Sequence, residues 1–443
     1  MDAKSERRRR LGLTAYALTT RLLQPVAPFV LRSRERRGKE DRPRRPERYG
    51  LASRSRPDGT LVWFHAASVG ELAAVLPLSK ALREARPDLH FLFTTGTVTS
   101  AEIAARRLES CDVHQYLPLD APRYVRRFLD HWRPDLAILT ESEIWPNLLW
   151  ESSARGIPLA LVNARMSDRS YDRWLRMRGL TAPLFSLFDV VLAQNASLAR
   201  KFSDVGARKA VAVGNLKIDS PPLQLDEAEL RRLRESLQGR IVLVAASTHE
   251  GEERIIAAAH KRLSRERPEL CTVIAPRHPE RGLQIAEELE SFGLKVEQRS
   301  RLLLPTRNTD VYIADTIGEL GTIYALGQIA IIGGSLVERG GQNPIEAIRA
   351  GAVVITGPNW QNFKDAYGML IFHKAAVVVA NSDELATAVS RLLDDEVELQ
   401  RMRAGAAQAL SVLSGALDKT VAELLPFLPK SGGPDEKGLR RAC

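Results

Sequence analysis

Short apolar runs alternate with amphipathic stretches along the chain from about Thr60 onward. The first runs are "LVWFHAA", "LHFLFTTG", "DLAILTE", "IPLALVNA" and "DVVLAQN". Between them lie stretches such as "ELAAVLPLSKALREA" and "SAEIAARRLES", in which apolar positions recur at helical spacing. Strands that alternate with helices predict βαβ units and a parallel sheet covered by helices on both faces.

The same alternation begins again after "DSPPLQLDEAELRRLRESL", where two prolines precede a charged helix and indicate a connection. The later runs are "RIVLVAAST", "CTVIAPRH", "DVYIADT", "IAIIGGS", "AVVITGP" and "AAVVVA". Because 443 residues exceed what one core accommodates, about two domains are expected. We therefore predict an α/β protein with two Rossmann-like, doubly wound domains, at residues 56–220 and 221–430, facing across a cleft. A flexible tail is expected at residues 431–443.

The first 55 residues differ from the rest of the chain in charge. They contain 16 Lys/Arg and 6 Asp/Glu, whereas the remaining residues contain 48 of each, so the whole excess of ten lies in this segment. Its apolar part, residues 11–31, is interrupted by an arginine, a glutamine and two prolines. Since a clean membrane span needs about 20 apolar residues, a segment lying in the interface over anionic lipid is favoured. A disordered basic tail is the alternative.

Composition and known motifs exclude several functions. The three cysteines have neither paired nor metal-ligand spacing, which favours a reducing cytoplasm and no structural zinc. Neither GxxxxGK[ST] nor GxGxxG occurs, which argues against a P-loop NTPase and a standard dinucleotide fold. His249, His278 and Asp315 do not form a zinc-binding spacing. The neutral body argues against nucleic-acid binding, and we expect neither a metal nor a cofactor.

In the first half, three polar clusters follow apolar runs, where an open α/β sheet presents its ligand loops. Glu71, in "SVGE", is either a partner of a helix dipole or a general base. The cluster "TESEIWPN" contains Glu141, an acidic residue at the end of a buried strand. Lys217 follows in "GNLKID", where an ordinary loop lysine is the alternative.

The second half contains a further strand exit and two glycine stretches. Arg277, in "APRHPER", offers a planar guanidinium suited to phosphate. The stretch "GELG" precedes "GGSLVERGGQNPIEA", in which glycines before Asn343 and Pro344 are expected to leave backbone N–H groups free for phosphate at a helix start. Glu346, in the first turn, is either a dipole partner or an acceptor for sugar hydroxyls.

Eight motifs, in order, resemble those of the lipid A Kdo transferases, where Kdo is 3-deoxy-D-manno-octulosonate. The motifs are "FHAASVGE", "TTGTVTSA", "ESEIWPN", "NARMSDRS", "GNLKID", "APRHPER", "GGSLVERGGQNPIEA" and "GPNWQNF". These enzymes are inverting GT-B glycosyltransferases that use CMP-Kdo. The resemblance covers roughly residues 10 to 425 and includes the N-terminal apolar segment with its basic flanks.

This resemblance implies roles for individual residues. The family's catalytic base falls on Glu71, and the groups that steady its transition state fall on Glu141 and Lys217. Its CMP contacts fall on Pro276, Arg277, Gly318, Glu319, Leu320, Asn343, Pro344, Ile345 and Glu346. Gln342 is a departure, because the family is expected to have histidine there.

The implied function is transfer of Kdo from CMP-Kdo to a lipid A precursor, lipid IVA, in lipopolysaccharide inner-core biosynthesis. The enzyme is expected at the cytoplasmic face of the bacterial inner membrane, with residues 1–55 on its anionic surface. One alternative is another GT-B sugar-nucleotide enzyme, a UDP-dependent transferase or a UDP-GlcNAc 2-epimerase. The other is a non-catalytic binder of membrane surfaces or nucleic acid.

Overall fold

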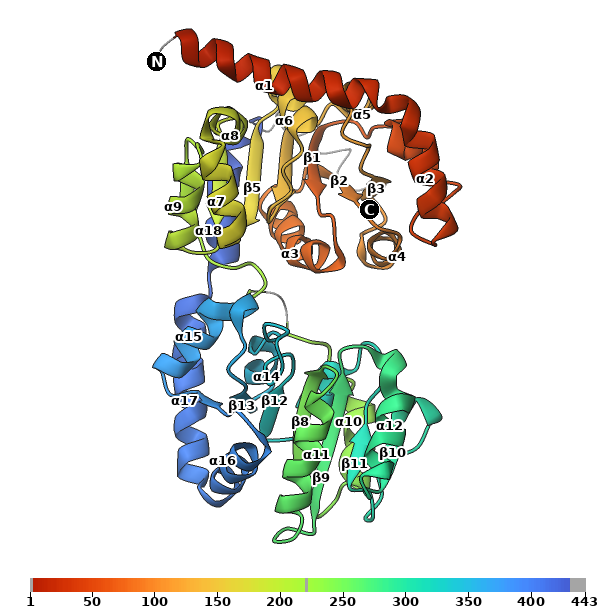
Figure 1. Ribbon diagram of the computed structural model, residues 1–443, viewed down its shortest axis with the longest axis vertical. Helices are drawn as coiled ribbons and strands as arrows, with labels where there is room; N and C mark the ends of the chain where they lie inside the picture. The colour runs from red at the N-terminus through yellow and green to blue at the C-terminus, as the bar shows by residue number, and fades with distance from the viewer. Residues whose placement is uncertain (1–2, 220–221, 431–443) are drawn as a thin grey trace. The chain divides into compact units, whose positions relative to one another are not determined.

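The computed structural model describes residues 3–219 and 222–430, which divide into two compact units (Figure 1). The first unit contains the described residues up to 219 together with those from 414 onward, and the second contains residues 222–413. Each unit is built on a parallel sheet of seven strands. The predicted α/β class with two parallel, Rossmann-like sheets is therefore confirmed, while the predicted tail at 431–443 lies outside the described residues.

The sheet of the first unit has the strand order β3-β2-β1-β4-β5-β6-β7. Its strands are β1 (Thr60–His65), β2 (Leu89–Thr95), β3 (Val113–Tyr116), β4 (Leu136–Thr140), β5 (Leu159–Ala164), β6 (Val190–Ala193) and β7 (Ala210–Ala212). Its helices are α1 (Ala3–Leu22), α2 (Ala27–Arg36), α3 (Val69–Ala85), α4 (Val98–Arg107), α5 (Pro122–Trp132), α6 (Pro146–Ala154), α7 (Asp168–Arg176), α8 (Arg178–Phe185), α9 (Ala196–Asp204) and α18 (Ala416–Leu424). The order reverses between β1 and β4, the place where such sheets bind ligands.

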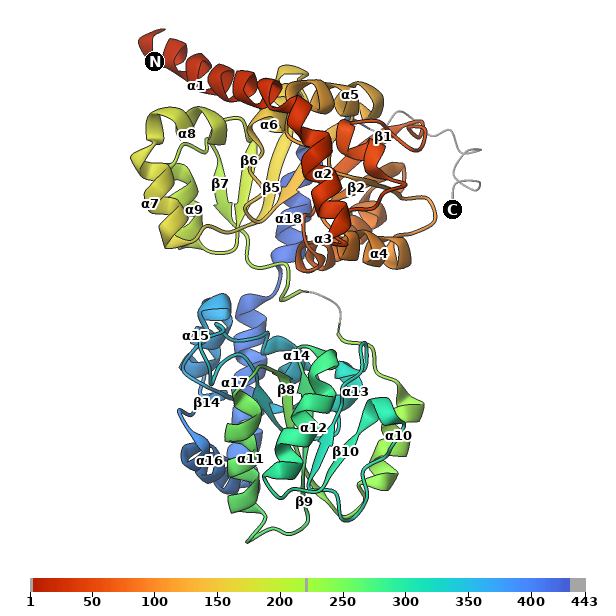
Figure 2. The same ribbon diagram turned by 45° about the vertical axis from the view of Figure 1, so that its right-hand side comes forward.

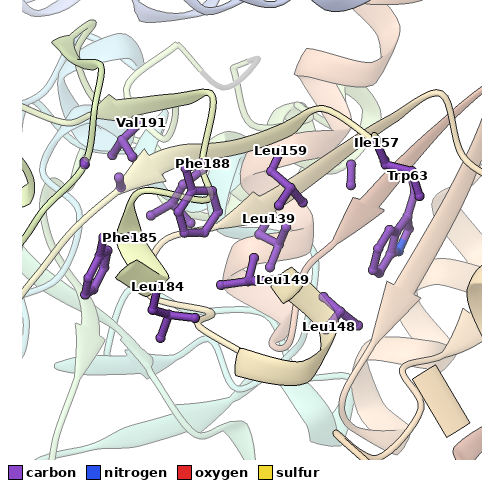
Figure 3. Close-up of a cluster of buried hydrophobic side chains, with 14 of the residues drawn as sticks. Trp63, Leu139, Leu148, Leu149, Ile157, Leu159, Leu184, Phe185, Phe188 and Val191 are labelled. Carbon is purple, nitrogen blue, oxygen red and sulfur yellow. The ribbon is translucent and has the colours of Figure 1, made fainter. Parts of the chain in front are cut away.

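Alternate residues of the strands build two separate cores. Trp63 of β1 packs on one face with residues of α5, α6, α8 and α9, and Figure 3 shows part of this cluster. Phe64 packs on the other face with residues of α3, α4 and α18. Because both faces are buried, the strands are apolar at nearly every position, as parallel strands generally are.

The second sheet has the order β10-β11-β9-β8-β12-β13-β14, which reverses between β8 and β12. Its strands are β8 (Ile241–Thr248), β9 (Leu270–Pro276), β10 (Val296–Gln298), β11 (Val311–Ile313), β12 (Ile329–Ile332), β13 (Val353–Thr356) and β14 (Ala376–Val378). Its helices are α10 (Glu227–Ser236), α11 (Glu252–Leu263), α12 (Gly282–Ser291), α13 (Leu320–Tyr324), α14 (Ile345–Arg349), α15 (Lys364–Phe372), α16 (Ser382–Asp394) and α17 (Glu396–Leu413). Helices α11, α12 and α16 cover one face, and α10 and α13 to α15 cover the other.

The boundary expected at residue 430 is corrected to Leu413. Helix α18 returns to the first unit, where Ala416 and Leu424 are buried in the same core as residues of α3 (Figure 2). The carboxylate of Asp219 accepts hydrogen bonds from the backbone N–H groups of Gly415 and Leu417. The boundary differs from the expected one because α18 has an apolar face that packs on the first sheet and completes its cover.

The segment 1–55 was expected to be separate, but its described residues, 3–55, group with the first unit. Helix α1 contacts α5, α6 and α8, and the side chain of Leu31 in α2 is fully buried. The Tyr16 hydroxyl donates to Asp120, and the Asn147 amide donates to the Thr20 hydroxyl. No helix in the described part of the chain is both long enough and apolar enough to cross a membrane.

Asp120 connects α1 to the start of α6 and generates a prediction about stability. Its carboxylate accepts the backbone N–H groups of Asn147 and Leu148, and burial raises its pKa from 3.8 to about 6. The folded state therefore keeps this proton to higher pH than the unfolded state, so stability is lost as the pH rises through about 6.

We expect Asp120→Asn to remove that dependence. Between pH 4 and pH 7, the free energy of unfolding of the wild type should fall relative to this variant by on the order of 3 kcal/mol. Chemical denaturation at a series of pH values measures the difference. Asp130→Asn, at an exposed aspartate of α5, is the control and should leave the pH dependence unchanged. Parallel pH curves for Asp120→Asn and the wild type would contradict the assignment.

Candidate functional site

Glu71 begins helix α3 in a capping box at the carboxyl end of β1. Ser68 is the N-cap, its hydroxyl accepts the Glu71 backbone N–H at 3.4 Å, and it donates to Glu71 Oε1 at 2.9 Å. The other carboxylate oxygen, Oε2, accepts the Ala67 backbone N–H at 2.9 Å and faces the Thr140 hydroxyl at 2.8 Å. Glu71 is thus a helix-start carboxylate, and the same residue is also partly open to solvent at the sheet edge.

Glu141 and Lys217 form an ion pair beside this helix start. Lys217 Nζ lies 2.6 Å from Glu141 Oε1, and Arg165 lies 3.7 Å from Oε2. Glu141 is buried and has φ of +51°, a conformation that costs a non-glycine residue on the order of 1 kcal/mol. Lys217 Nζ is also 4.0 Å from the position that a Cβ on Gly70 would occupy. The structure therefore brings together the three residues predicted to be catalytic.

His65, at the end of β1, has hydrogen-bond partners that were not predicted from the sequence. The buried ring of His65 bonds through Nδ1 to Thr94, as expected for a core histidine, and through Nε2 to Glu143 at 3.3 Å. The Trp145 indole N–H donates to the same Glu143 oxygen at 2.8 Å. Burial opposes ionisation of Glu143, but these donors outweigh burial and lower its pKa. The sequence feature that could have indicated Glu143 is the pair of glutamates in "ESEIWPN", of which only Glu141 was assigned a role.

In the second unit, the glycine-rich loop after β12 already holds a carboxylate. Glu252, in the first turn of α11, accepts the backbone N–H groups of Gly334, Ser335 and Leu336 at 2.6, 3.0 and 2.9 Å. It also accepts the His249 N–H at 2.8 Å. The Glu252 side chain is fully buried, and burial raises its pKa despite these four donors. A protein carboxylate therefore occupies the anion-binding turn that the glycines form.

The prediction of free backbone N–H groups at the start of α14 is wrong for three residues. The N–H groups of Gly341 and Gln342 bond to the carbonyls of Gly334 and Gly333, and that of Ile345 bonds to the Asn343 side chain. The physical reason is the positive φ of +74° at Gly341, which lets the chain fold back onto the end of β12. Helix α14 has only five residues, so its dipole is correspondingly small.

Arg277, directly after β9, and Glu346, in the first turn of α14, nevertheless lie near one another. Burial raises the pKa of Glu346, while a hydrogen bond from Asn343 and the charge of Arg277 partly oppose this rise. Pro276 ends β9, and the Arg277 side chain is exposed. Gln342, the residue that departs from the expected histidine, bonds through its amide to His249 Nε2 at 3.1 Å.

The run Gly318 to Leu320 lies at the start of α13, a helix that contacts α14. The Glu319 carboxylate is held by Arg299 at 2.5 Å and by the Thr316 hydroxyl, and the hydrogen bond from Arg299 is the main reason its pKa is lowered. Burial raises the pKa of Tyr324, later in α13, and the nearby Glu346 carboxylate adds to this rise. Within the described residues, no group of three or more His, Cys, Asp and Glu side chains is arranged to hold a metal ion.

The fold belongs to the GT-B-like class of two Rossmann-like sheets with polar clusters at their strand ends. A solved glycosyltransferase from Rickettsia africae matches 85% of this chain and 100% of its own with a TM-score of 0.58, at 11% identity. This likeness shows the fold alone.

Sequence relatives define the family. The family model described as 3-deoxy-D-manno-octulosonic-acid transferase (kdotransferase) matches residues 43–220. The chain is 35% identical to the probable mitochondrial 3-deoxy-D-manno-octulosonic acid transferase of Arabidopsis thaliana over 430 residues, 94% of this chain and 96% of the relative. It is also 35% identical to the transferase of that name from Haemophilus influenzae, over 88% of this chain and 92% of the relative. The chain belongs to the 3-deoxy-D-manno-octulosonic acid transferase family and is a glycosyltransferase, so the resemblance found in the sequence is confirmed.

Glu252 generates a prediction for the second unit. In Glu252→Gln, an amide NH₂ replaces one oxygen and faces two backbone N–H donors, which then lose their acceptor. Each buried donor left unsatisfied costs about 1–3 kcal/mol, so the free energy of unfolding should fall by roughly 2–4 kcal/mol. Denaturation followed by circular dichroism measures the loss. Glu250→Gln, at an exposed neighbour, should change stability little, and equal stability of the two variants would contradict the role of Glu252.

Proposed function

We propose that this enzyme transfers Kdo from CMP-Kdo to a lipid A precursor, lipid IVA, with inversion and release of CMP, in lipopolysaccharide inner-core biosynthesis. The observation that carries the proposal is the cluster of Glu71, Glu141 and Lys217 at the carboxyl edge of β1 and β4, in a chain of the Kdo transferase family. Membership of that family argues against the epimerase and against the non-catalytic binder.

Glu71 acts as the general base in this proposal. Its Oε2 is held by Ala67 and Thr140, whereas Oε1 is bonded to the exposed Ser68 hydroxyl and faces the open edge of the sheet. The acceptor hydroxyl gives its proton to this carboxylate while its oxygen attacks the anomeric carbon of Kdo from the face opposite CMP. The bond between Kdo and phosphate breaks, and its electrons leave with CMP.

Glu141 and Lys217 steady the transition state. The Lys217 ammonium is fixed by the buried carboxylate of Glu141, so its charge is positioned before the reaction begins. Because Glu141 is held in a strained backbone conformation, the loop orients this pair at some cost in stability.

The second unit binds CMP at the ends of β9 and β12. The exposed guanidinium of Arg277 takes the phosphate, and Glu346 accepts ribose hydroxyls. Binding of the phosphate depends mainly on Arg277, because α14 is short and the N–H groups of Gly341, Gln342 and Ile345 are already hydrogen-bonded. The remaining contacts are proposed at Pro276, Gly318, Glu319, Leu320, Asn343, Pro344 and Ile345. Neither a metal nor a cofactor takes part.

Helices α1 and α2 bind the cytoplasmic face of a bacterial inner membrane. These helices and the short turn between them expose six apolar side chains, which we call the apolar patch: Leu18, Leu22, Leu23, Val26, Phe29 and Val30. The same helices contain arginines that suit anionic headgroups, among them Arg21, Arg32 and Arg36. An exposed apolar patch flanked by arginines is typical of a helix that lies in the membrane interface, where a lipid acceptor is embedded.

The proposed base is tested by Glu71→Gln, which keeps the side-chain shape and removes the basicity. Transfer from CMP-Kdo generated in situ to a tetraacylated lipid A precursor in detergent should fall about 10²-fold or more. CMP binding, measured by the shift in melting temperature, should be unchanged. Glu84→Gln, at an exposed residue of the same helix, is the matched control and should stay active. Full activity in Glu71→Gln would mean that Glu71 only caps helix α3 and is not the base.

The membrane contact is tested by placing charges in the apolar patch. Leu22→Asp with Phe29→Asp, both at side chains that are 70% exposed, should reduce binding to vesicles containing anionic phospholipid by about tenfold or more. Co-sedimentation with vesicles measures the binding, and CMP binding should persist. Val397→Asp, at an equally exposed apolar residue of α17, is the control. Undiminished vesicle binding of the double variant would rule out the patch.

A further inference from the structure

Helices α1 and α5 contact each other in the first unit (Figure 1), and residues of both line a cavity of about 630 Å³. Four of the lining side chains are arginines: Arg21, Arg123, Arg126 and Arg127. Three of them meet on α5 because residues three and four positions apart lie on one face of a helix. The other face of α5 is buried in the core, where Val125, Phe128 and Trp132 pack. The arginines therefore occupy the outer face of this helix.

Most of these arginines lack a protein counter-ion. Three of them have no carboxylate within ion-pair distance among the described residues: Arg21, Arg123 and Arg127. The fourth, Arg126, is bonded through Nε to Glu151 at 2.8 Å. Asp130, a carboxylate in the lining, is paired with Arg155 at 2.8 Å. The cavity therefore has a surplus of positive charge that favours an anionic ligand.

Gln24 adds an unsatisfied donor to this lining. It follows α1 and lines the cavity, and its amide nitrogen is buried without a hydrogen-bond partner in the described part of the chain. A buried donor without an acceptor is unfavourable, so an acceptor oxygen in the cavity stabilises this amide. Guanidinium groups likewise only donate, and they match phosphate oxygens in geometry. The chemistry of the lining therefore fits a phosphate group.

Leu18 joins the cavity to the apolar patch. It lines the cavity, is 56% exposed, and lies one helical turn before Leu22 of the same patch. A phosphate among the arginines thus has apolar surface beside it. A free phosphate ion would leave that surface unused, and it is small for a cavity within the range of about 300–1,000 Å³ that organic ligands occupy. These features favour a phosphate that is carried by a lipid.

The position of the cavity separates it from the proposed base. Helix α5 packs on one face of the first sheet, whereas α3, which begins with Glu71 in its first turn, packs on the opposite face. A headgroup held on the outer face of α5 therefore anchors the protein and is not the group that reacts. This placement favours a lipid of the bilayer over the acceptor.

We propose that this cavity binds the phosphate headgroup of an anionic phospholipid of the bilayer. The arginines hold the phosphate, and the acyl chains run past Leu18 onto the apolar patch. The inference rests on the proposed membrane contact of α1 and α2 and goes beyond it. A charged surface responds to the charge density of a bilayer, whereas a lined cavity binds one headgroup at a defined place.

The first test measures co-sedimentation of the full chain with phosphatidylcholine vesicles, prepared with and without phosphatidylglycerol. Arg123→Gln with Arg127→Gln removes two of the unpaired charges. Affinity for the vesicles that contain phosphatidylglycerol should fall about tenfold or more. Affinity for pure phosphatidylcholine vesicles depends on the apolar patch and should not change. An unchanged melting temperature shows that the variant is folded.

Arg106→Gln with Arg107→Gln is the matched control. These two arginines are adjacent, exposed and without an ion-pair partner among the described residues, and α4 packs on the opposite face of the sheet. The control removes the same charge and should keep the preference for phosphatidylglycerol. Equal losses in the two double variants would mean that only net charge matters, and would overturn the proposal. Wild-type binding by the α5 variant would overturn it as well.

A soluble lipid distinguishes the sources of phosphate. Isothermal titration of the wild type with dihexanoylphosphatidylglycerol, below its critical micelle concentration, should show one bound molecule per chain. Arg123→Gln with Arg127→Gln should abolish this binding, and inorganic phosphate should bind the wild type about tenfold or more weakly, because it buries no acyl chain. Equally tight binding of inorganic phosphate would assign the cavity to a free anion and overturn the proposal.

Two further outcomes separate this inference from the proposed function. A raised KM for the lipid acceptor in the α5 variant, with its vesicle preference intact, would assign the cavity to the acceptor and overturn the proposal. Binding of the soluble lipid needs no bilayer, so it tests the cavity even where Leu22→Asp with Phe29→Asp leaves vesicle binding undiminished and the apolar patch is ruled out. Binding that is lost in the α5 variant and kept in the α4 variant supports the headgroup site.

Discussion

A carboxylate withdrawn from water at the end of a buried strand must receive hydrogen-bond donors, and much of this structure follows from that constraint. Glu71 takes donors from its own capping box, and Glu141 takes Lys217. Glu252 takes four backbone N–H groups, and Asp120 takes two with a tyrosine hydroxyl. In each case the same donors also fix the path of a loop. The hydrogen bonds that stabilise the carboxylate therefore also determine the shape of the site.

The fold was largely predictable because it depends on periodicity. Apolar runs at nearly every strand position and helices between them indicate parallel sheets, and both sheets were found. The return of α18 to the first unit was not predictable, because the sequence of a short amphipathic helix does not indicate which sheet the helix covers. The charge of residues 1–55 likewise suggested a separate segment, although Leu31 is buried and Tyr16 is hydrogen-bonded within the first unit.

The sequence predicted which residue types lie at the strand ends of the candidate site, but it did not predict their contacts. Glu71, Glu141 and Lys217 were named from their motifs, and the structure places them together. The N–H groups of Gly334, Ser335 and Leu336 could not be recognised as occupied, because their partner, Glu252, lies 82 residues earlier in the chain than Gly334. The contact between Thr140 and Glu71 was not predictable either, since the pairing of β1 with β4 brings the two side chains together.

The return of α18 also orders events during synthesis. The second unit is a continuous insertion between residues 219 and 414, so the first sheet lacks part of its cover until the ribosome has completed nearly the whole chain. The apolar surface of α3 that meets Ala416 and Leu424 stays uncovered in a nascent chain whose second unit is already complete. The unit with the shorter sequence separations can thus finish folding first, although it is encoded second.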